Sequence, residues 1–344
     1  VRAHERLRLC EALTIPRRAC APQRLLQNQT ISAAKMTGFL SHFCGVFVLS
    51  ITDLAARFWI GAVKSLAHVP LGARKVLARV VAAVLWVGIP KRRHVAMTNL
   101  RVCFPDKTEG ELRAIAKANY VHLARAALDH GVLWNGSAQA VGKLVTFEGL
   151  ERVTDKTNRP LIIVAPHFVG LDAVGIAFNL HVRGVSLYQK QRNAAWDEAA
   201  LAGRRRFSDP VLIAKGEHRR GDLLAVVRAM RQGLPFYYLP DMDFGARDAV
   251  FVPFFGEPAA TLAMCGRLAH ATKAKVLFCV AEMTETGYTA HISEPWENYP
   301  TGDDVTDTRR INAELERWIL KLPDQYLWTH RRFKTRPEGA KPLY

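Results

Sequence analysis

The segment at 165–172 carries the residues best suited to acid–base chemistry. It has the sequence APHFVGLD and places His167 five residues before Asp172. A carboxylate that holds an imidazole fixes its tautomer and stabilises the imidazolium that forms when the ring takes a proton. Because no Ser or Cys nucleophile lies nearby, such a pair suits general-base activation of a substrate hydroxyl. The alternative is a histidine that caps a helix whose first turn contains an acid.

The spacing carries little weight without its context. The chain has 12 histidines and 31 acidic residues among 344 positions, so chance supplies about one such pair, and His167 is the one histidine that has it. The apolar run LIIVA at 161–165 predicts a buried strand directly before it. Open α/β sheets bind ligands just beyond the carboxyl ends of such strands, which favours a functional His167.

The elements that must position His167 alternate between strands and helices. Apolar runs predict strands at 161–165, 185–188, 211–213, 236–239 and 275–281. Helical spacing predicts helices at 107–134, 170–182, 197–206, 221–232, 261–272 and 307–321. This alternation predicts an α/β fold with a mostly parallel sheet flanked by helices.

The N-terminal part differs from the rest. Residues 1–35 hold seven basic side chains against two acids, and an apolar run follows Met36. We therefore expect 1–35 to be a basic extension upstream of a natural start at Met36. The run at 38–51 is about 14 residues long, shorter than the roughly 20 that a spanning helix needs.

Residues 58–89 are amphipathic and basic, with Trp59 and Trp86 as candidate interfacial anchors. We therefore expect 36–90 to be an N-terminal membrane-associating helical region and 91–344 to be the catalytic domain. A buried helical hairpin of a soluble protein is the alternative. Basic residues dominate after the apolar run, so with a start at Met36 the positive-inside rule predicts that the bulk of the chain lies in the cytoplasm.

The charge balance points to a polyanionic partner. Lys and Arg total 48 against 31 acids, for a net charge of +17. Nucleic acid, an anionic membrane surface and an acidic or phosphorylated partner all fit, and a basic chain without a charged partner is the alternative. An apolar fraction of 49% excludes a mainly disordered chain.

Several familiar sites are absent from the sequence. It contains no GxSxG, GxGxxG, P-loop or HExxH motif, which argues against a serine hydrolase, a dinucleotide enzyme, a P-loop ATPase and a zincin. Its six cysteines form no CxxC pair and are too sparse for a disulfide framework. We expect reduced thiols and no metal site.

Beyond these features, the sequence resembles a known family. The segment at 165–172 resembles the HxxxxD motif of the glycerolipid acyltransferases. From about residue 58 to the end, further segments resemble in order the motifs of the late acyltransferases of lipid A biosynthesis, the lauroyl/myristoyl-type enzymes of Gram-negative bacteria. These segments are NLRVCFP at 99–105, GRRR at 203–206, YLPDMDFG at 238–245, VPFFG at 252–256, AAT at 259–261 and PDQYLWTHRRFKTRPEG at 323–339. Many members have Glu where this chain has the shorter Asp172.

The resemblance implies an O-acyltransferase that moves an acyl chain from acyl carrier protein to a hydroxyacyl chain of a Kdo-bearing lipid A precursor. It implies that His167 is the general base, that Asp172 orients it, and that no cofactor is needed besides the acyl-carrier co-substrate. The carrier protein is acidic, the acceptor lipid is phosphorylated and the inner leaflet is anionic, which together account for the charge. We expect a location at the cytoplasmic face of the cell inner membrane and no nucleic-acid partner.

Four more residues are candidate substrate-binding groups. Arg204 and Arg206 could supply donors to an oxyanion or bind a lipid phosphate, and a solvated basic face is the alternative. Asp241 and Asp243 could orient the acceptor or pair with the arginines. Two acids alone make a poor metal site, and a turn held by Asp side chains is the alternative.

Two other functions stay open at this point. One is a related membrane acyltransferase that acts on a lysophospholipid or another lipid. The other is a basic, membrane-peripheral binding protein without turnover, for which exchange of His167 for alanine would leave function intact.

Overall fold

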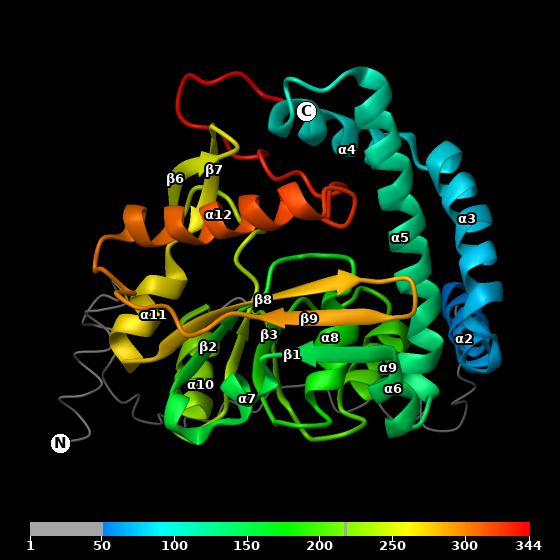
Figure 1. The fold of residues 1–344 in the computed structure, drawn as a ribbon, viewed down its shortest axis with the longest axis horizontal. Coiled ribbons are helices and arrows are strands. Elements are labelled where there is room, and N and C mark those ends of the chain that lie inside the picture. Colours follow the sequence, from blue (N-terminus) through cyan, green and yellow to red (C-terminus); the bar gives the residue numbers. More distant parts are fainter. Residues whose placement is uncertain (1–50, 217–218) are drawn as a thin grey trace, which may run out of the picture.

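The computed structural model describes residues 51–216 and 219–344. The expectations for 1–35, for a start at Met36 and for the apolar run up to residue 50 therefore concern residues outside the described part. Figure 1 shows an α/β domain with a long helix, α5 (Glu109–Asn135), along one side. Within the described ranges, no helix combines the length and the apolar character needed to cross a bilayer.

A seven-stranded sheet forms the centre of the domain. Its strand order is β1-β9-β8-β2-β5-β3-β4. The strands are β1 (Val145–Glu148), β2 (Leu161–Val164), β3 (Val185–Tyr188), β4 (Val211–Ala214), β5 (Phe236–Tyr238), β8 (Lys275–Met283) and β9 (Tyr288–Ile292). Every pairing in this sheet is parallel except that of β8 with β9. The mostly parallel sheet flanked by helices is thus confirmed.

The central strand β2 is covered on both faces. Ile162 and Val164 belong to the apolar cluster that includes side chains of α10 (Arg219–Arg231), α11 (Met264–Thr272) and α12 (Asp304–Lys321). Leu161 and Ile163 alternate to the opposite cluster, with α8 (Leu171–Phe178). A parallel strand buried on both faces has an unbroken apolar sequence, which explains why β2 could be recognised from the sequence.

Some predicted elements have different bounds. The helix expected at 261–272 begins at Met264, because 261 and 262 end β7 (Glu257–Leu262), which pairs with β6 (Ala249–Phe254). This hairpin was not predicted. Its turn residues Phe255 and Gly256 both have positive φ, as tight hairpin turns of the primed types require.

The predicted helices at 197–206 and 307–321 are displaced by a few residues, since α9 covers Ala194–Arg204 and α12 begins at Asp304. Shorter elements, α6 (Ala138–Leu144), α7 (Leu150–Thr154) and the 3₁₀ turn η3 (Lys156–Asn158), surround β1. Helix ends depend on capping, and the caps of α9 and α12 are the Asn193 and Asp303 side chains.

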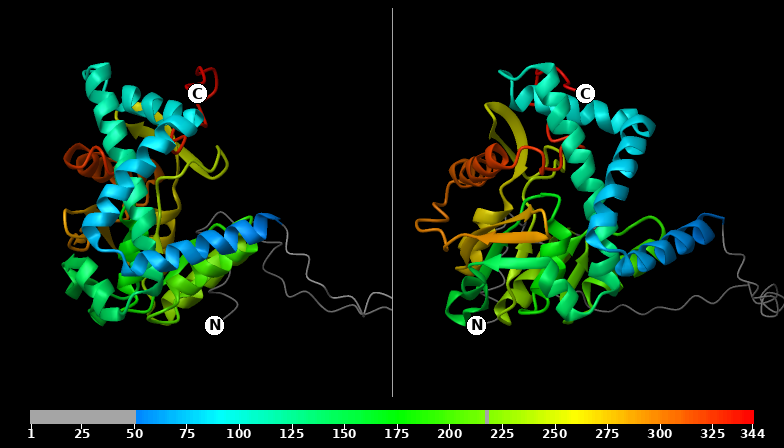
Figure 2. Two further views of the ribbon diagram at one scale, coloured as in Figure 1. Left: turned by 90° about the vertical axis from the view of Figure 1, so that its right-hand side faces the viewer. Right: turned by 45° about the vertical axis from the view of Figure 1, so that its right-hand side comes forward.

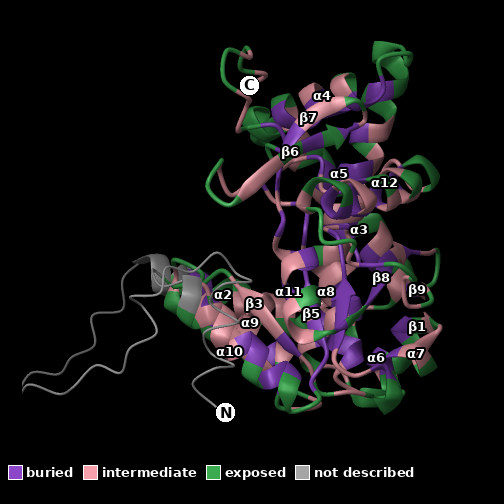
Figure 3. Ribbon diagram, turned by 90° about the vertical axis from the view of Figure 1, so that its left-hand side faces the viewer, coloured by how far each residue is buried: buried purple, intermediate pink, exposed green. Residues whose placement is uncertain are grey.

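The N-terminal helices pack against α5. They are α2 (Ile51–Ser65), the 3₁₀ turn η2 (Leu66–His68), α3 (Leu71–Gly88) and α4 (Pro90–Cys103). Ala78 and Ala82 of α3 form a small cluster with Tyr120 and Ala124 of α5. Figure 2 shows α3 (light blue) alongside α5, whereas α2 (dark blue) meets α5 near one end and points away from the body. Figure 3 shows buried residues (purple) among the strands and the helices around them, and exposed residues (green) mainly at the outer edges of the molecule.

The C-terminal tail folds back onto this helical side. Asn99 Nδ2 donates to the carbonyls of Trp328 and His330, both at 2.7 Å. Asn119 Nδ2 donates to the carbonyls of Asp324 at 2.9 Å and Tyr326 at 2.7 Å. These two buried amides hold an extended stretch of tail that has no strand partner along most of its length, which explains why Asn occupies both positions.

Candidate active site

His167 and Asp241 follow neighbouring strands of the sheet. β2 ends at Val164 and β5 ends at Tyr238, the two strands are parallel, and the N–H of Ala165 donates to the carbonyl of Tyr238 at 2.8 Å. The loops beyond parallel neighbours lie at the same edge of a sheet. The fold therefore brings the two residues together although 74 positions separate them.

The Asp241 carboxylate holds His167 at two points. Its Oδ1 lies 2.7 Å from the ring Nδ1, and its Oδ2 accepts the backbone N–H of His167 at 2.9 Å. The side chain of Asp241 is 1% exposed and that of His167 is 19% exposed. Since an ionised carboxylate only accepts, Nδ1 carries the ring proton and Nε2 keeps its lone pair. That tautomer is the one that can take a proton from a hydroxyl.

Asp241 is ionised at neutral pH despite its burial. Burial raises the pKa of this carboxyl, but the positive charge that the His167 ring carries when protonated, the hydrogen bonds of His167, and then the charge of Arg332 outweigh it and lower the pKa to about 2. A fixed negative charge on Nδ1 stabilises an imidazolium without itself taking the proton.

The expected contact between Asp172 and His167 is not the one in the structure. Asp172 Oδ2 lies 2.9 Å from Nε2 of His130 on α5, and Asp172 Oδ1 accepts from Nε of Arg204 on α9 at 3.0 Å. The acid that holds the ring of His167 is Asp241. Asp172 stands in the first turn of α8, where its partners come from α5 and α9 rather than from the loop before it.

The partners of Asp172 keep it charged. Burial raises the pKa of its carboxyl, but the charge of Arg204 and the hydrogen bond and charge of His130 lower that pKa strongly. The same contact acts on His130. Burial lowers the pKa of His130, but the hydrogen bond and the charge of Asp172 raise that pKa above its ordinary value. The three side chains form one charged cluster that joins α5, α8 and α9.

The structure separates the two candidate arginines. Arg204 lies on Asp172 and is one-third exposed. Arg206 donates to the carbonyl oxygens of Leu133 at 3.1 Å and Gly136 at 2.6 Å, where α5 ends. A cation at a helix C-terminus satisfies free carbonyls and opposes the helix dipole. Of the pair, Arg206 therefore has the placement of a helix cap, whereas Arg204 is held by Asp172 with part of its side chain exposed.

Asp243 takes part in holding the tail. Its carboxylate accepts from the N–H of Thr335 at 2.6 Å, from the hydroxyl of Thr335 at 2.7 Å and from the N–H of Gly245 at 2.9 Å. Its own N–H donates to Nε2 of His330 at 3.1 Å. These contacts favour the alternative of a turn held by an Asp side chain, whereas Asp241 lies on the candidate base.

The tail also supports the loop of His167. The N–H of Leu327 donates to the carbonyl of His167 at 3.0 Å, and the N–H of Val169 donates to the carbonyl of Gln325 at 2.8 Å. The Arg332 side chain is buried and donates to the carbonyl of Ala260 at 2.9 Å. The basic tail segment thus packs into the fold at Arg332 rather than presenting that side chain to solvent.

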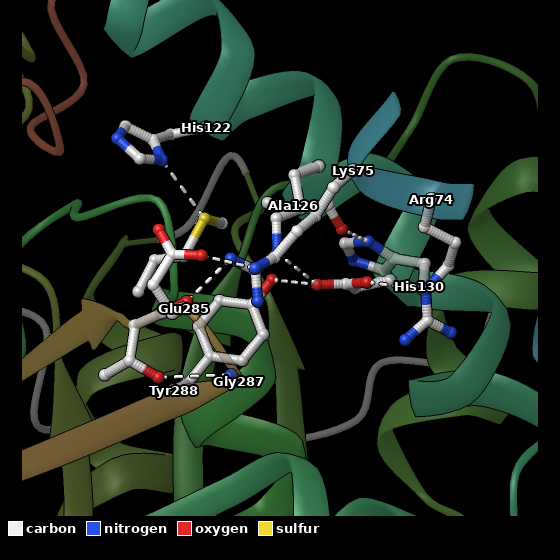
Figure 4. A network of polar contacts seen from close by, with 12 residues as sticks. Arg74, Lys75, His122, Ala126, His130, Glu285, Gly287 and Tyr288 are labelled. Atoms are coloured by element: carbon white, nitrogen blue, oxygen red, sulfur yellow. Dashed lines mark hydrogen bonds and ion pairs between the residues drawn. The ribbon is translucent and has the colours of Figure 1, made fainter. Parts of the chain in front are cut away.

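Sequence reasoning missed His130 and the polar network around it. Arg74 of α3 and Arg125 of α5 flank the fully buried Asp129, at 3.1 and 3.5 Å between nitrogen and oxygen, and Tyr288 of β9 donates to Asp129 at 2.8 Å. Figure 4 shows this network between α3, α5 and the turn from β8 to β9. The sequence around His130 shows only the spacing of a helix. That spacing does not reveal Asp172, the partner of His130 that lies 42 residues away.

No group of three or more His, Cys, Asp or Glu side chains in the described ranges could hold a metal ion.

Comparison with known proteins shows the family of the chain. A model of the family "Bacterial lipid A biosynthesis acyltransferase" matches residues 49–335. The chain belongs to this family. The match runs from α2 to the tail that supports His167.

Three relatives show how far the similarity extends. A lipid A biosynthesis acyltransferase of Haemophilus influenzae is 31% identical over 73% of this chain and 80% of its own length. A lipid A biosynthesis lauroyltransferase of Escherichia coli is 30% identical over 74% of this chain and 83% of its own. A palmitoleoyltransferase of lipid A biosynthesis from the same organism is 31% identical, with the same two coverages.

Proposed function

We propose that this member of the family transfers an acyl chain from acyl carrier protein to a hydroxyacyl chain of a Kdo-bearing lipid A precursor, with His167 as general base. The contact between Asp241 and His167 carries the proposal, since it leaves Nε2 as the free acceptor of a proton. The family assignment supports the acyl-transfer chemistry and the type of acceptor lipid.

The proposed step needs no covalent enzyme intermediate. Nε2 of His167 takes the proton of the acceptor hydroxyl as its oxygen attacks the thioester carbonyl carbon. The tetrahedral intermediate then collapses, the carbon–sulfur bond breaks, and the carrier thiolate leaves with the proton held by His167. Asp241 stabilises the imidazolium between these two transfers. The buried thiols Cys265 and Cys279, whose pKa burial raises to about 12 for each, are unsuited to act as nucleophiles.

Arg204 is the proposed ligand for an anionic group of the substrates. Asp172 fixes its guanidinium through Nε and Nη2, both 3.0 Å from Asp172 Oδ1, while a third of the side chain stays exposed. An arginine held in this way retains donors for an oxyanion or a phosphate and loses little entropy on binding. In this proposal Asp172 and His130 are positioning residues that act through Arg204.

The acceptor is a membrane lipid, so we propose that the chain works at the cytoplasmic face of the inner membrane. Its net charge of +17 suits an acidic carrier protein and an anionic leaflet. Relatives of nearly equal identity are named for lauroyl and palmitoleoyl transfer, so identity alone does not set the acyl chain that this protein prefers.

The test is a transfer assay read by mass spectrometry. The wild type and His167→Ala are incubated with acyl carrier protein loaded with lauroyl, myristoyl or palmitoleoyl chains, and with either a Kdo-bearing tetra-acylated precursor or a lysophospholipid. We expect one added acyl group on the lipid A precursor and its loss in His167→Ala. His270→Ala, an exposed histidine in the last turn of α11, is the control and should transfer normally.

Other outcomes would change the proposal. Transfer to the lysophospholipid alone would assign a different acceptor. Equal product from the wild type and His167→Ala would remove His167 as the base. Absence of transfer to either acceptor by a folded wild-type protein would favour a binding function.

A further inference from the structure

A basic surface cavity lies between α3, α4 and α5, away from the contacts of His167. Its volume is about 500 Å³, and its lining residues are Trp86, Pro90, Arg93, His94, Met97, Arg101 and Arg113. The α4 members stand at positions 90, 93, 94, 97 and 101, which is one face of a helix. The opposite face of α4 holds Asn99 against the tail.

The charges in this cavity are positioned by aromatic and backbone contacts. Arg93 donates from Nη1 to the carbonyl of Trp86 at 2.8 Å and stacks 5.5 Å from the centre of its ring. Lys117 lies 6.0 Å from the same ring centre. Arg101 pairs with the exposed Glu109. Arg113 adds a further cation, so one carboxylate faces several cations and the cavity is strongly positive.

An exposed apolar stripe runs along α3 beside the cavity. Val76, Val80, Val84 and Val87 recur every three to four residues, and their exposed fractions rise from 57% to 74% toward the cavity. The opposite face of α3 packs on α5. Ile89, between the stripe and α4, is also exposed. A contiguous apolar stripe in water marks a binding surface.

We propose that the cavity binds the phosphate of an anionic membrane lipid while the α3 stripe lies in the apolar layer of the bilayer. The inference rests on the proposed function only in that the acceptor is a membrane lipid. In a bilayer the phosphate groups border the acyl layer, and the cavity borders the most exposed end of the stripe, at Val87 and Ile89. Arginines are the side chains best matched to phosphate, and Trp86 has the amphipathic character of interfacial residues.

An acidic protein fits this surface less well. It would satisfy the cations of the cavity but would leave Val84 and Val87 in water, since the stripe carries no charge for it to match. A bilayer covers both features with one ligand. The buried Arg74–Asp129 pair fixes α3 to α5, so the stripe belongs to a firmly held helix.

The test measures binding of the purified full chain to vesicles of phosphatidylcholine with and without phosphatidylglycerol. Arg113→Gln combined with Lys117→Gln removes two cations from exposed positions without touching the helix backbone. Each basic residue near an anionic surface contributes about 1 kcal/mol, so we expect binding to the phosphatidylglycerol vesicles to fall about tenfold or more. Binding to neutral vesicles should be unchanged.

The matched control is Lys156→Gln combined with Arg231→Gln, which removes the same charge from η3 and the end of α10. Figure 1 shows α10 at the opposite end of the domain from α4. This control should bind both kinds of vesicle as the wild type does. A second variant, Val84→Ser with Val87→Ser, should weaken binding to both kinds of vesicle, and thermal unfolding checks that each variant is folded.

Three results would overturn the inference. One is equal vesicle binding by the wild type and the cavity variant, and another is an equal loss in the control. The third is unchanged vesicle binding with a raised KM for the acyl carrier protein in detergent, which would assign the cavity to the carrier. Vesicle binding does not depend on acyl transfer, so a failed transfer assay would leave this test intact.

Discussion

The two acids of the candidate site, Asp172 and Asp241, have different partners in the structure. Asp241 accepts from Nδ1 of His167, and Asp172 accepts from Arg204 and pairs with His130. The two acids therefore support different functions, and different measurements should detect them.

Asp241→Asn should reduce kcat by about 10² to 10⁴, because the amide lacks the charge that stabilises the imidazolium and does not enforce the Nδ1–H tautomer. KM should change little, since Asp241 is buried behind the ring. Steady-state kinetics with the acyl-carrier donor give both values. An Asp241→Asn enzyme with near-normal kcat would show that another group orients His167.

Asp172 should act through Arg204 and not through His167. A double-mutant cycle of Asp172→Asn and Arg204→Gln should be non-additive by about 1 kcal/mol or more in kcat/KM, because each change removes the same ion pair. Arg206→Gln is the control and should combine additively with Asp172→Asn, since its contacts are at the end of α5. Additive losses for Asp172 and Arg204 would contradict this assignment.

His330 should make the fold sensitive to acid. Burial lowers the pKa of His330 to about 4 from an ordinary 6.5, with smaller contributions from neighbouring charges. Between these values the unfolded chain binds the proton more readily, so stability is lost as pH falls from about 6.5 to 4, by up to about 3 kcal/mol. His330→Gln keeps an acceptor for the N–H of Asp243 and should flatten this part of the profile.

Urea unfolding at a series of pH values measures the effect. The slope of unfolding free energy against pH should be smaller in His330→Gln than in the wild type over this window. Identical slopes would mean that His330 is not the group that titrates.

At the residue scale, the sequence predicts where a side chain stands relative to a strand or helix. It does not predict which side chain distant in sequence will contact it. His167 was predicted at a strand end because β2 has an unbroken apolar sequence. Its partner Asp241 was found only as a member of a motif, and the assignment of Asp172 to the ring followed from nearness in sequence. Pairing across the edge of a parallel sheet leaves no trace in local spacing.

At the scale of elements, one glycine sets how closely the N-terminal helices approach α5. A Cβ at Gly131 would lie 2.6 Å from Cβ of Leu66 and 2.7 Å from the carbonyl oxygen of Val63. Backbone cannot yield as a flexible side chain does. The glycine is therefore what allows the end of α2 and η2 to pack directly on α5.

Gly131→Ala should destabilise the protein by about 1–3 kcal/mol, because α2 must move away from α5 to relieve the overlap. Gly142→Ala is the matched control, since a Cβ there meets nothing within 4 Å in the exposed face of α6. The control should be neutral or stabilising by about 0.5–1 kcal/mol, as expected for Gly to Ala in a helix. Denaturant unfolding of both variants measures the difference.

The elements that sequence analysis predicted are those with a clear apolar period, such as β3 at 185–188 and α5. It did not predict β1, β9 or the hairpin of β6 and β7. β1 and β9 lie at one edge of the sheet, where residues of β1 alternate in burial and no long apolar run forms. The hairpin depends on a two-residue turn with positive φ at Phe255, a residue that gives no turn signal.

At the scale of the whole molecule, the C-terminal tail closes the structure around the site. Its backbone is held by Asn99 and Asn119 from two N-terminal helices, and it supports the loop of His167. Arg332 also anchors the tail to the core, since it donates to the carbonyl of Ala260 in β7 and to the hydroxyl of Thr261 at 2.6 Å. The tail thus links α4 and α5 to the loop of the candidate base.

Arg332→Met should therefore affect both stability and activity. It leaves the buried carbonyl of Ala260 and the hydroxyl of Thr261 without their donor, which costs about 2–4 kcal/mol. It also removes a charge that lowers the pKa of Asp241. Arg331→Met is the control, because the side chain of Arg331 is exposed and its aromatic contact is 5.7 Å from the ring centre of Tyr344.

The two variants lose an arginine at adjacent positions of the same tail. Their comparison therefore separates the effect of losing the buried cation from the effect of losing any positive charge in the tail. Arg332→Met should unfold at lower denaturant and lose kcat even at temperatures where it is folded, because the loop of His167 depends on the tail that Arg332 anchors. Arg331→Met should match the wild type in both respects. If Arg332→Met were destabilised but kept full kcat when folded, the tail would close the fold without supporting the base, and the link from the C-terminus to His167 would be absent.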